Sequence, residues 1–398
     1  MNGNPKGTPM NQHATTRPAS CWAIPLLALT LLGSGCDLVA PPETKKRTGT
    51  FLDSPVEGLR YASGKYTNAD GHFRYKSGDN LTFKIGDIVL GQAKGQRLVT
   101  PVTLGEEVEV GFSNAASNIA QFLQSIDQDR NAENGIVIPL ELHDAAAELT
   151  LDFDLPSAEF GPAAYDVLQQ LVPGSTLIAQ SAATSHLVGS LLESMAGHYR
   201  ADCDGATTGE MEIIVNREGR IGGWVFLQGQ SLLMTTTYSQ GNITHGGVFG
   251  FIGRGWPNDG AFSGTLADGS IEGAWRYWGD EVDDETDGTI EGSLHEGVTP
   301  FLGDEVAQFV GSYSGAITGS DEEFGGFSIN HLGDLDESYG NLELFGTIKS
   351  IDGDVAKIIG LTDEGDRISG TINADGLAKG TWKSQYWDES GTFEFTRN

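Results

Sequence analysis

Basic residues are scarce in this sequence. It contains 24 lysines and arginines against 55 aspartates and glutamates. Residues 1–35 hold only Lys6 and Arg17, so residues 36–398 have a net charge of 22 − 55 = −33. A surface of this charge repels phosphate groups, which argues against nucleic acid as a partner. Hydrophobic residues make up 38% of the chain, an ordinary share, so the charge does not indicate disorder.

A hydrophobic run long enough to cross a membrane is also lacking. The apolar run at residues 22–32 is shorter than the ~20 residues that a transmembrane helix needs. It follows a weakly basic, acid-free stretch, which is the form of a signal peptide over residues 1–35. It ends in Leu32-Gly-Ser-Gly-Cys36, which resembles the lipobox of bacterial lipoproteins, although the leucine lies one place further from the cysteine than usual. The resemblance implies cleavage before Cys36 and acylation of Cys36; an ordinary signal peptide cut elsewhere is the alternative.

Residues 36–49 are predicted to be a tether. Pro41-Pro42 stiffen it, and Lys45-Lys46-Arg47 favour an anionic membrane surface. The several acyl chains of a processed lipoprotein anchor it more firmly than one chain does. We therefore expect a lipid-anchored protein of the cell envelope, at the inner or the outer membrane, that faces the periplasm or the exterior.

Cysteines are few as well. The sequence has three, and if Cys21 leaves with the signal peptide and Cys36 is acylated, Cys203 remains alone, without a disulfide partner. Asp202 and Asp204 flank Cys203, and their charges raise the pKa of a thiol. We expect Cys203 to be buried or inert rather than a nucleophile.

Residues 50–195 are predicted to form a β-sandwich plus a helical part. Short alternating strands separated by Gly-containing turns run through residues 50–92. Val56-Glu-Gly-Leu59 and the Thr-x-Ala-Asp-Gly-x-Phe turn at residues 67–73 resemble the prealbumin-type β-sandwich of carboxypeptidase regulatory-like domains. That resemblance covers about forty residues and implies a structural or binding module rather than catalysis.

Helices are predicted after these strands. Ser113 or Asn114 caps the first helix, and its apolar residues recur at helical spacing. Pro162 suits the first turn of a second helix, and a third helix carries His186, which we interpret as a packing or surface residue. The stretch from residue 51 to 187 also resembles a module at the front of many proteobacterial lipoproteins, for which the resemblance implies no activity.

The first helix leads into a loop of alternating oxygen ligands. Asp127, Asp129 and Asn131 match the first three ligand positions of an EF-hand or dockerin calcium loop, so the sequence predicts Ca²⁺ there. Ala132 replaces the turn glycine and Ile138 replaces the bidentate glutamate. An Asp/Asn-rich turn that caps the helix and leads into a strand is the alternative.

The C-terminal half contains a tandem repeat, predicted at residues 196–296 and 307–398. Gly197-His-Tyr199 matches Gly311-Ser-Tyr313 at an offset of 313 − 199 = 114 residues. Later pieces match in the same order at offsets of 107 and 103, as Gly273-Ala-Trp275 matches Gly380-Thr-Trp382 (382 − 275 = 107) and Gly288 matches Gly391 (391 − 288 = 103). Shrinking offsets indicate deletions in the loops of the second copy, which a repeated β unit tolerates.

Each copy alternates short strands with Asp-Gly, Glu-Gly and Gly-Gly turns and has no helical period, which predicts an antiparallel barrel or sandwich. The fold class is therefore mainly β with a small helical subregion: an N-terminal β-sandwich plus helices, then two tandem antiparallel β repeats. Matched aromatic residues in the copies have two interpretations. Trp275, Tyr277, Trp382 and Tyr386 form either a ligand-binding set for sugar rings or small apolar molecules, or core packing.

The function predicted from these features is a membrane-anchored envelope lipoprotein that acts as a non-enzymatic binding, adhesion or structural module, stabilised by calcium. Envelope proteins or glycan are the expected partners. The sequence carries none of the P-loop, HExxH, Gly-x-Ser-x-Gly or CxxC motifs. A polysaccharide-acting hydrolase with its site in the β repeats is the alternative, because paired carboxylates leave no motif.

Overall fold

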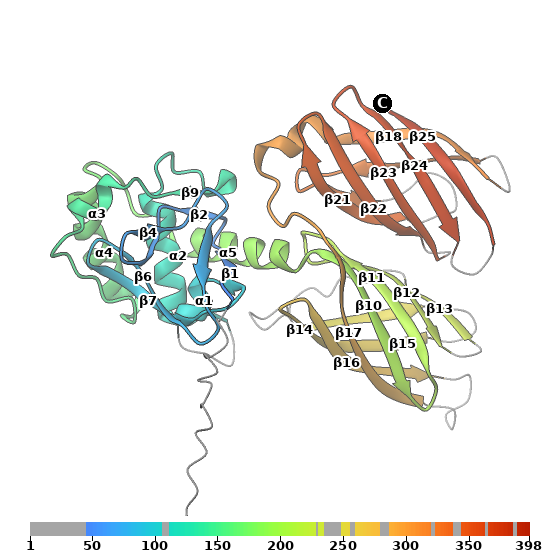
Figure 1. Cartoon of the computed structure of the whole chain (residues 1–398), viewed down its shortest axis with the longest axis horizontal. Coiled ribbons are helices and arrows are strands. Elements are labelled where there is room, and N and C mark those ends of the chain that lie inside the picture. The colour runs from blue at the N-terminus through green and yellow to red at the C-terminus, as the bar shows by residue number, and fades with distance from the viewer. Residues whose placement is uncertain are drawn as a thin grey trace, which may run out of the picture. The chain divides into compact units, whose positions relative to one another are not determined.

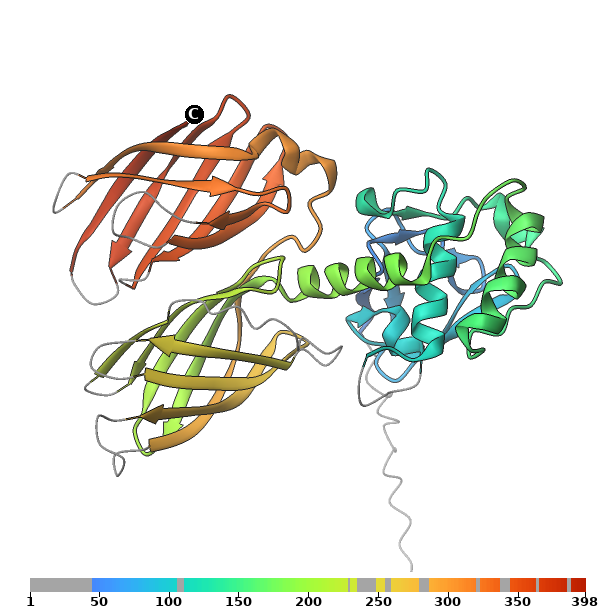
Figure 2. The ribbon, with the colours of Figure 1, turned by 180° about the vertical axis from the view of Figure 1, so that it is seen from behind.

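The computed structural model is mainly β, with a smaller helical part near the N-terminus (Figures 1 and 2), as the sequence predicts. It describes residues 45–105, 111–227, 230–234, 248–254, 259–278, 286–319, 323–336, 344–362, 365–384 and 388–398. Among these residues, every helix is too short or too polar to span a membrane.

The N-terminal module contains three small sheets. One has the order β5-β1-β8, one has the order β4-β3-β6-β7, and β2 pairs with β9. The strands are β1 (Arg47–Phe51), β2 (Val56–Glu57), β3 (Arg60–Ala62), β4 (Lys65–Tyr66), β5 (His72–Tyr75), β6 (Asn80–Ile85), β7 (Ile88–Lys94), β8 (Leu98–Val99) and β9 (Ile136–Val137). β1 begins inside the segment predicted as tether, because residues 47–50 pair with residues 72–75 of β5.

The helices of this module take part in two apolar clusters, a main core shared with its sheets and a smaller cluster around Ala120, Ala183 and Leu187. They are α1 (Pro101–Leu104), α2 (Asn114–Ile126), α3 (Glu141–Ala145), α4 (Ser157–Leu171), α5 (Gln180–Met195) and the 3₁₀ turn η1 (Ala132–Asn134). Ser113 caps α2 by accepting a hydrogen bond from the main-chain N–H of Ala116 at 3.2 Å. Ile119 and Phe122 then face the core that also holds Phe51. The capped, amphipathic helix predicted here is confirmed.

The position of Pro162 in α4 differs from the prediction. The helix begins at Ser157, so Pro162 lies inside it rather than in its first turn. A proline there forfeits one helical hydrogen bond. Phe160, two residues before Pro162, is fully buried, and its burial favours a helix that begins upstream of the proline.

The two β repeats have the same strand order. The first is an eight-stranded sheet with the order β13-β12-β11-β10-β17-β16-β15-β14, and the second is a closed barrel of β18 to β25. The strands of the first are β10 (Gly197–Gly205), β11 (Gly209–Val215), β12 (Ile221–Leu227), β13 (Gln230–Met234), β14 (Val248–Arg254), β15 (Asp259–Ala267), β16 (Ser270–Trp278) and β17 (Thr286–Gly297). After the 3₁₀ turn η2 (Gly303–Phe309), those of the second are β18 (Gly311–Thr318), β19 (Glu323–Ile329), β20 (Asp334–Asp336), β21 (Leu344–Asp352), β22 (Val355–Thr362), β23 (Asp366–Asn373), β24 (Leu377–Ser384) and β25 (Ser390–Arg397). In both repeats the first strand pairs with the last.

Matched residues make the same hydrogen bonds in both repeats. The tyrosine hydroxyl at the start of the first strand donates to a main-chain oxygen four residues earlier, from Tyr199 to Met195 at 2.8 Å and from Tyr313 to Phe309 at 2.7 Å. The same residue type with the same local partner at two places 114 residues apart is what a duplicated unit predicts.

The turn between the second and third strands is also repeated. Asn216 and Asn330 each accept, through the side-chain oxygen, the main-chain N–H four residues later, at 2.8 and 3.0 Å. The turn glycines, Gly219 and Gly333, have φ values of +76° and +82°, in the left-handed region that glycine adopts without strain. These residues therefore specify the same reversal of the chain twice.

Buried polar contacts join the two repeats at these turns. The guanidinium of Arg217, in the turn of the first repeat, is 1% exposed and donates to Thr347 at 2.5 Å and to the main-chain oxygen of Ile348 at 2.8 Å. The carboxylate of Asp334 accepts from the main-chain N–H of Arg217 at 3.0 Å. Glu212 of the first repeat also forms an ion pair with Arg367 of the second. These contacts link the second strand and following turn of the first repeat to the second repeat.

An apolar cluster completes the contact between the repeats. Its buried residues come from both copies and from the segments beside them: Ala196, Ile214, Val298, Phe345, Ile359 and Leu361. Gly222 lies against the ring of Phe345, and a Cβ at this glycine would come within 2.2 Å of that ring. The repeats therefore meet through close packing as well as through ion pairs.

Candidate functional site

The predicted site residues are distributed over different parts of the chain. Cys36 and Tyr386 lie outside the described residues, as does the side chain of Tyr277. Trp275 is 1% exposed and belongs to the core of the first repeat, whereas Trp382 is half-buried in the second. The indole N–H of each donates to a main-chain oxygen of its own repeat, Trp275 at 3.2 Å and Trp382 at 3.0 Å. These contacts favour core packing over ligand binding for the two tryptophans.

Cys203 is buried in the first repeat and has no disulfide partner. Burial, together with the charges of Asp202 and Asp204, raises the pKa of its thiol to about 12. The sequence predicts the direction of this shift, but burial is its main cause.

The carboxylates of the predicted calcium loop accept hydrogen bonds within the loop. Asp127 accepts the main-chain N–H of Asn131 and of Val137, both at 2.8 Å. Asp129 accepts the main-chain N–H of Asn131 at 3.0 Å and the side-chain amide of Asn134 at 2.9 Å. Burial raises the pKa of Asp127, while the bond from Asn134 lowers that of Asp129. These bonds tie the end of α2 to β9 as an Asp/Asn-rich turn does.

Calcium at this loop stays a prediction with a direct test. If Ca²⁺ binds there, millimolar CaCl₂ is expected to raise the melting temperature of the protein, because a ligand that prefers the folded state stabilises it. Asp129→Asn keeps the turn, since Asp129 is exposed, but removes a charged ligand and should abolish the rise. Differential scanning calorimetry with and without EDTA measures it, and an equal rise in the variant would contradict the site.

A polar cluster in the N-terminal module, buried at Ser54 and exposed at Glu133, has a more specific geometry. The hydroxyl of Ser54 lies 2.9 Å from Nε2 of His186, and Nδ1 of His186 lies 3.2 Å from the carboxylate of Glu133. Ser54 comes from the turn after β1, His186 from α5 and Glu133 from η1. The main-chain N–H of Ser54 donates to the hydroxyl of Ser190, one turn further along α5, at 2.9 Å.

Two features around Ser54 are energetically costly. Its φ of +56° lies in the left-handed region, which is unfavourable for a serine. The neighbouring Asp53 is fully buried, and its two carboxylate oxygens each lie 3.2 Å from the side-chain amide of Gln124. Burial raises the pKa of Asp53 to about 6, although His186 and Gln124 act in the opposite direction. The contacts of this turn therefore compensate for strain and for a desolvated carboxylate.

The order serine, histidine, carboxylate is the one that acyl hydrolases use, with the histidine as base and the carboxylate orienting it. Here Ser54 is only 1% exposed and its own N–H is bonded to Ser190, so in this conformation no substrate carbonyl can reach the hydroxyl. The arrangement therefore serves to fasten the strained turn to α5. We call Ser54, His186 and Glu133 the latch.

The sequence shows no local signal for the latch. Ser54 and His186 are 132 residues apart, and His186 and Glu133 are 53 apart. The interpretation of His186 as a packing residue is close to its structural role, but it does not identify the partners. Only the tertiary fold brings the three segments together.

The latch predicts a loss of stability when His186 is replaced. His186→Ala removes the partner of both Ser54 and Glu133 and is expected to lower the free energy of unfolding by about 1–3 kcal/mol. His186→Gln can keep one of the two bonds and should fall in between. Urea denaturation measures these values against Ser185→Ala, an exposed neighbour on α5 that should change little. Equal effects at positions 185 and 186 would contradict the latch.

The buried Asp53 predicts a specific pH dependence. Its folded-state pKa of about 6 exceeds the ordinary 3.8, so the folded protein binds this proton more tightly than the unfolded chain does. Its contribution to stability is thus full below pH 4 and is lost as the pH rises through 6. Asp53→Asn does not titrate and should gain up to about 3 kcal/mol relative to the wild type between pH 4 and 7.5. In the same urea titrations, the stability of Asp129→Asn relative to the wild type should change with pH in the opposite direction. The reason is that the pKa of the Asp129 carboxyl is lowered, whereas that of Asp53 is raised.

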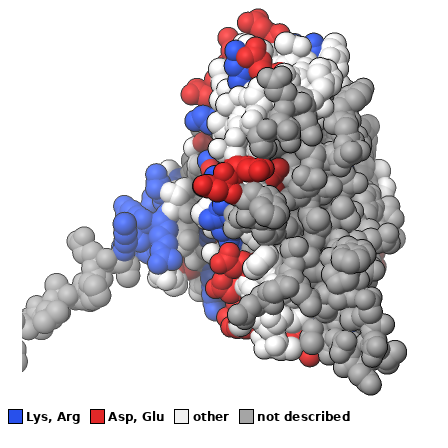
Figure 3. All heavy atoms as spheres, turned by 90° about the vertical axis from the view of Figure 1, so that its right-hand side faces the viewer, with Lys and Arg blue, Asp and Glu red and all other residues white. Residues whose placement is uncertain are grey.

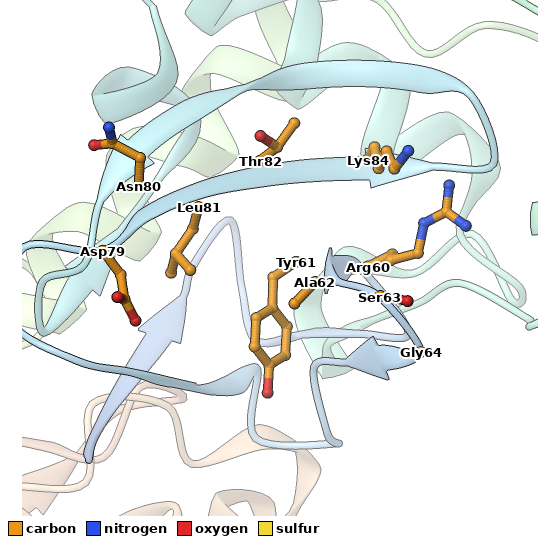
Figure 4. Close-up of a pocket in the computed structure, with 10 residues that line it drawn as sticks. All are labelled: Arg60, Tyr61, Ala62, Ser63, Gly64, Asp79, Asn80, Leu81, Thr82 and Lys84. Atoms are coloured by element: carbon orange, nitrogen blue, oxygen red, sulfur yellow. The ribbon is translucent and has the colours of Figure 1, made fainter. Parts of the chain in front are cut away.

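A cleft of about 560 Å³ opens on the same module, between β3 and β6 (Figure 4). Arg60 and Lys84 lie at one end of it, Asp79 at the other, and the ring of Tyr61 lies between them. Separated charges of this kind complement a dipolar or anionic solute. The cleft is distinct from the latch, since none of the latch residues lines it.

No protein-family model matches the chain, and no curated protein matches it. Within the described residues, no group of three or more His, Cys, Asp and Glu side chains is arranged to hold a metal ion.

Proposed function

We propose that the chain is a lipid-anchored protein of the bacterial cell envelope whose β repeats form a rigid, non-enzymatic binding or adhesion unit. The observation that carries this proposal is the buried contact between the repeats. Arg217, Asp334 and Glu212 are each 1% exposed, so the two repeats are fixed to each other by groups that water does not reach. Two β repeats joined in this way would display their loops at a constant spacing, which suits recognition of a macromolecule such as an envelope protein or glycan.

The interiors of the repeats support a scaffold rather than a small-molecule container. In the second repeat, the barrel is filled by large side chains from strands around its circumference, among them Tyr313, Phe327, Ile358 and Phe393. An eight-stranded barrel filled in this way is a packed core. The binding surface is then expected on the outer faces and loops.

The anchor is tested by labelling cells with a palmitate analogue. The wild-type protein should incorporate the label and fractionate with membranes, whereas Cys36→Ser should incorporate none, because the acylated thiol is gone. Cys203→Ala is the matched control, since it removes the other cysteine of the mature chain and should keep the label. Undiminished labelling of Cys36→Ser would contradict the anchor.

A different activity, acyl hydrolysis with Ser54 as the nucleophile, is suggested by the Ser54–His186–Glu133 contacts and is tested with a fluorophosphonate probe, which reacts with activated serines. The proposal predicts that Ser54 stays unlabelled, because its hydroxyl is buried in the latch. Labelling of the wild type that disappears in Ser54→Ala and His186→Gln would instead make the N-terminal module an acyl hydrolase.

A further inference from the structure

The charge of the chain is distributed unevenly along the sequence. Residues 45–105 contain ten lysines and arginines and five aspartates and glutamates, a net charge of 10 − 5 = +5. Residues 106–398 contain 12 basic and 48 acidic residues, a net charge of 12 − 48 = −36. The one positive part of the mature protein therefore begins nine residues after Cys36 (45 − 36).

The fold gathers these cations on neighbouring strands. β1 pairs with β5 so that Thr48 lies opposite Arg74, and the Arg74 guanidinium donates to the Thr48 hydroxyl. On the other side of β1, the main-chain N–H of Thr50 donates to the carbonyl of Arg97 at 2.8 Å. The exposed cations of these strands and of their flanks define a basic face: Lys45, Lys46, Arg47, Arg74, Lys76, Lys94 and Arg97.

Figure 3 shows a patch of lysine and arginine side chains at one side of the view, whereas elsewhere in the view basic and acidic side chains are interspersed. Along β5, His72 and Arg74 are exposed while Phe73 and Tyr75 point into the core. This alternation means that Arg74 is held by the strand on the outward side of the sheet. The basic face is thus a surface of a folded sheet and not only a charged tail.

We infer that the basic face docks on anionic lipid headgroups of the membrane to which the chain is anchored. This inference rests on the proposed function, because the acyl group on Cys36 would bring these residues to the membrane first. Each lysine or arginine at an anionic surface strengthens binding roughly fivefold. The same negative surface repels the acidic β repeats, so the basic face is the part of the chain that this surface attracts.

The test uses residues 37–398, which lack both the acylated cysteine and the apolar run at residues 22–32, so the basic face is measured without the anchor or the signal peptide. In 50 mM salt this protein should sediment with vesicles of phosphatidylcholine that contain 30% phosphatidylglycerol, and not with phosphatidylcholine alone. Arg74→Glu/Lys76→Glu should weaken the binding at least tenfold. Raising the salt to 500 mM should abolish it, since the attraction is electrostatic.

The matched control is Lys357→Glu/Lys383→Glu, which changes the net charge equally at exposed positions of the second repeat. It should bind within about twofold of the parent protein, as these residues lie outside the basic face. Equal losses in the two double variants would overturn the inference, as would equal binding to neutral vesicles. Capture by polyglutamate beads but not by anionic vesicles would also overturn it and would reassign the basic face to an acidic polypeptide.

The lipid anchor and the docking of the basic face can be refuted independently of each other. Vesicle binding together with an unlabelled Cys36 in cells would remove the lipid anchor and leave the basic face. Palmitate labelling together with no vesicle binding would leave the anchor and remove the basic face.

Discussion

Arg217→Ala is expected to lower the free energy of unfolding by about 3–5 kcal/mol, the usual cost of removing one partner from a buried ion pair. The guanidinium donates to the main-chain oxygens of Thr299, Pro300 and Ile348 as well as to Thr347. Alanine leaves two of these acceptors, the Thr347 hydroxyl and the main-chain oxygen of Ile348, buried without this donor. It also leaves the carboxylate of Asp334, which lies 3.8 Å from the guanidinium, without its nearest positive charge.

The loss of stability caused by Arg217→Ala should become larger as the pH rises. Burial already raises the pKa of Asp334, and Arg217 opposes that shift. Without Arg217 the folded-state pKa rises further above the unfolded value, so stability is lost as the pH increases through this range. Asp334→Asn in the same background removes the titrating group and should flatten the pH dependence.

Urea denaturation at pH 5 and pH 8, followed by tryptophan fluorescence, measures both effects. Lys379→Ala is the matched control, because its ion pair with Glu394 is 3.0 Å long but both side chains are more than half exposed. Exposed pairs of this kind contribute about 1 kcal/mol or less. An Arg217→Ala variant as stable as Lys379→Ala would mean that the repeats are not held together by this network.

The duplication could be predicted from the sequence because its signals are local. An asparagine and a glycine three residues later specify one turn, and the same pair at residues 216 and 219 recurs at residues 330 and 333. The strand period of two then determines which side chains of each copy face inward. Residue matching therefore predicts that the two copies share a β fold and which of their residues correspond.

The junction between the copies could not be predicted in this way, because it depends on where the copies differ. The residue that matches Arg217 in the second copy is His331 (217 + 114), and the residue that matches Asp334 in the first is Arg220 (334 − 114). The partners of the junction are 117 residues or more apart in several of its bonds. Neither sequence spacing nor strand periodicity predicts that such distant residues are in contact. The contacts of the latch could not be predicted for the same reason.

Trp275→Ala is expected to lower the free energy of unfolding by about 3–5 kcal/mol, the range for deleting a large buried aromatic side chain. The indole is 1% exposed and packs in a core that includes Phe262, which lies opposite it on β15, and Ile290. Gly288 lies directly against the ring, since a Cβ at that glycine would come within 2.5 Å of the indole nitrogen. The site has no space for a ligand above this face of the ring.

The matched residue of the second copy provides the control for this last prediction. Trp382 makes the same hydrogen bond to a main-chain oxygen but is only half-buried, so Trp382→Ala should cost less than Trp275→Ala in the same urea titration. Trp275→Phe should fall between the wild type and Trp275→Ala, because phenylalanine keeps most of the apolar contact and loses the bond to the carbonyl of Asp204. If these tryptophans served a ligand instead, their replacement would leave stability nearly unchanged and reduce binding. A Trp275→Ala variant within about 1 kcal/mol of the wild type would therefore favour the ligand-binding interpretation over packing.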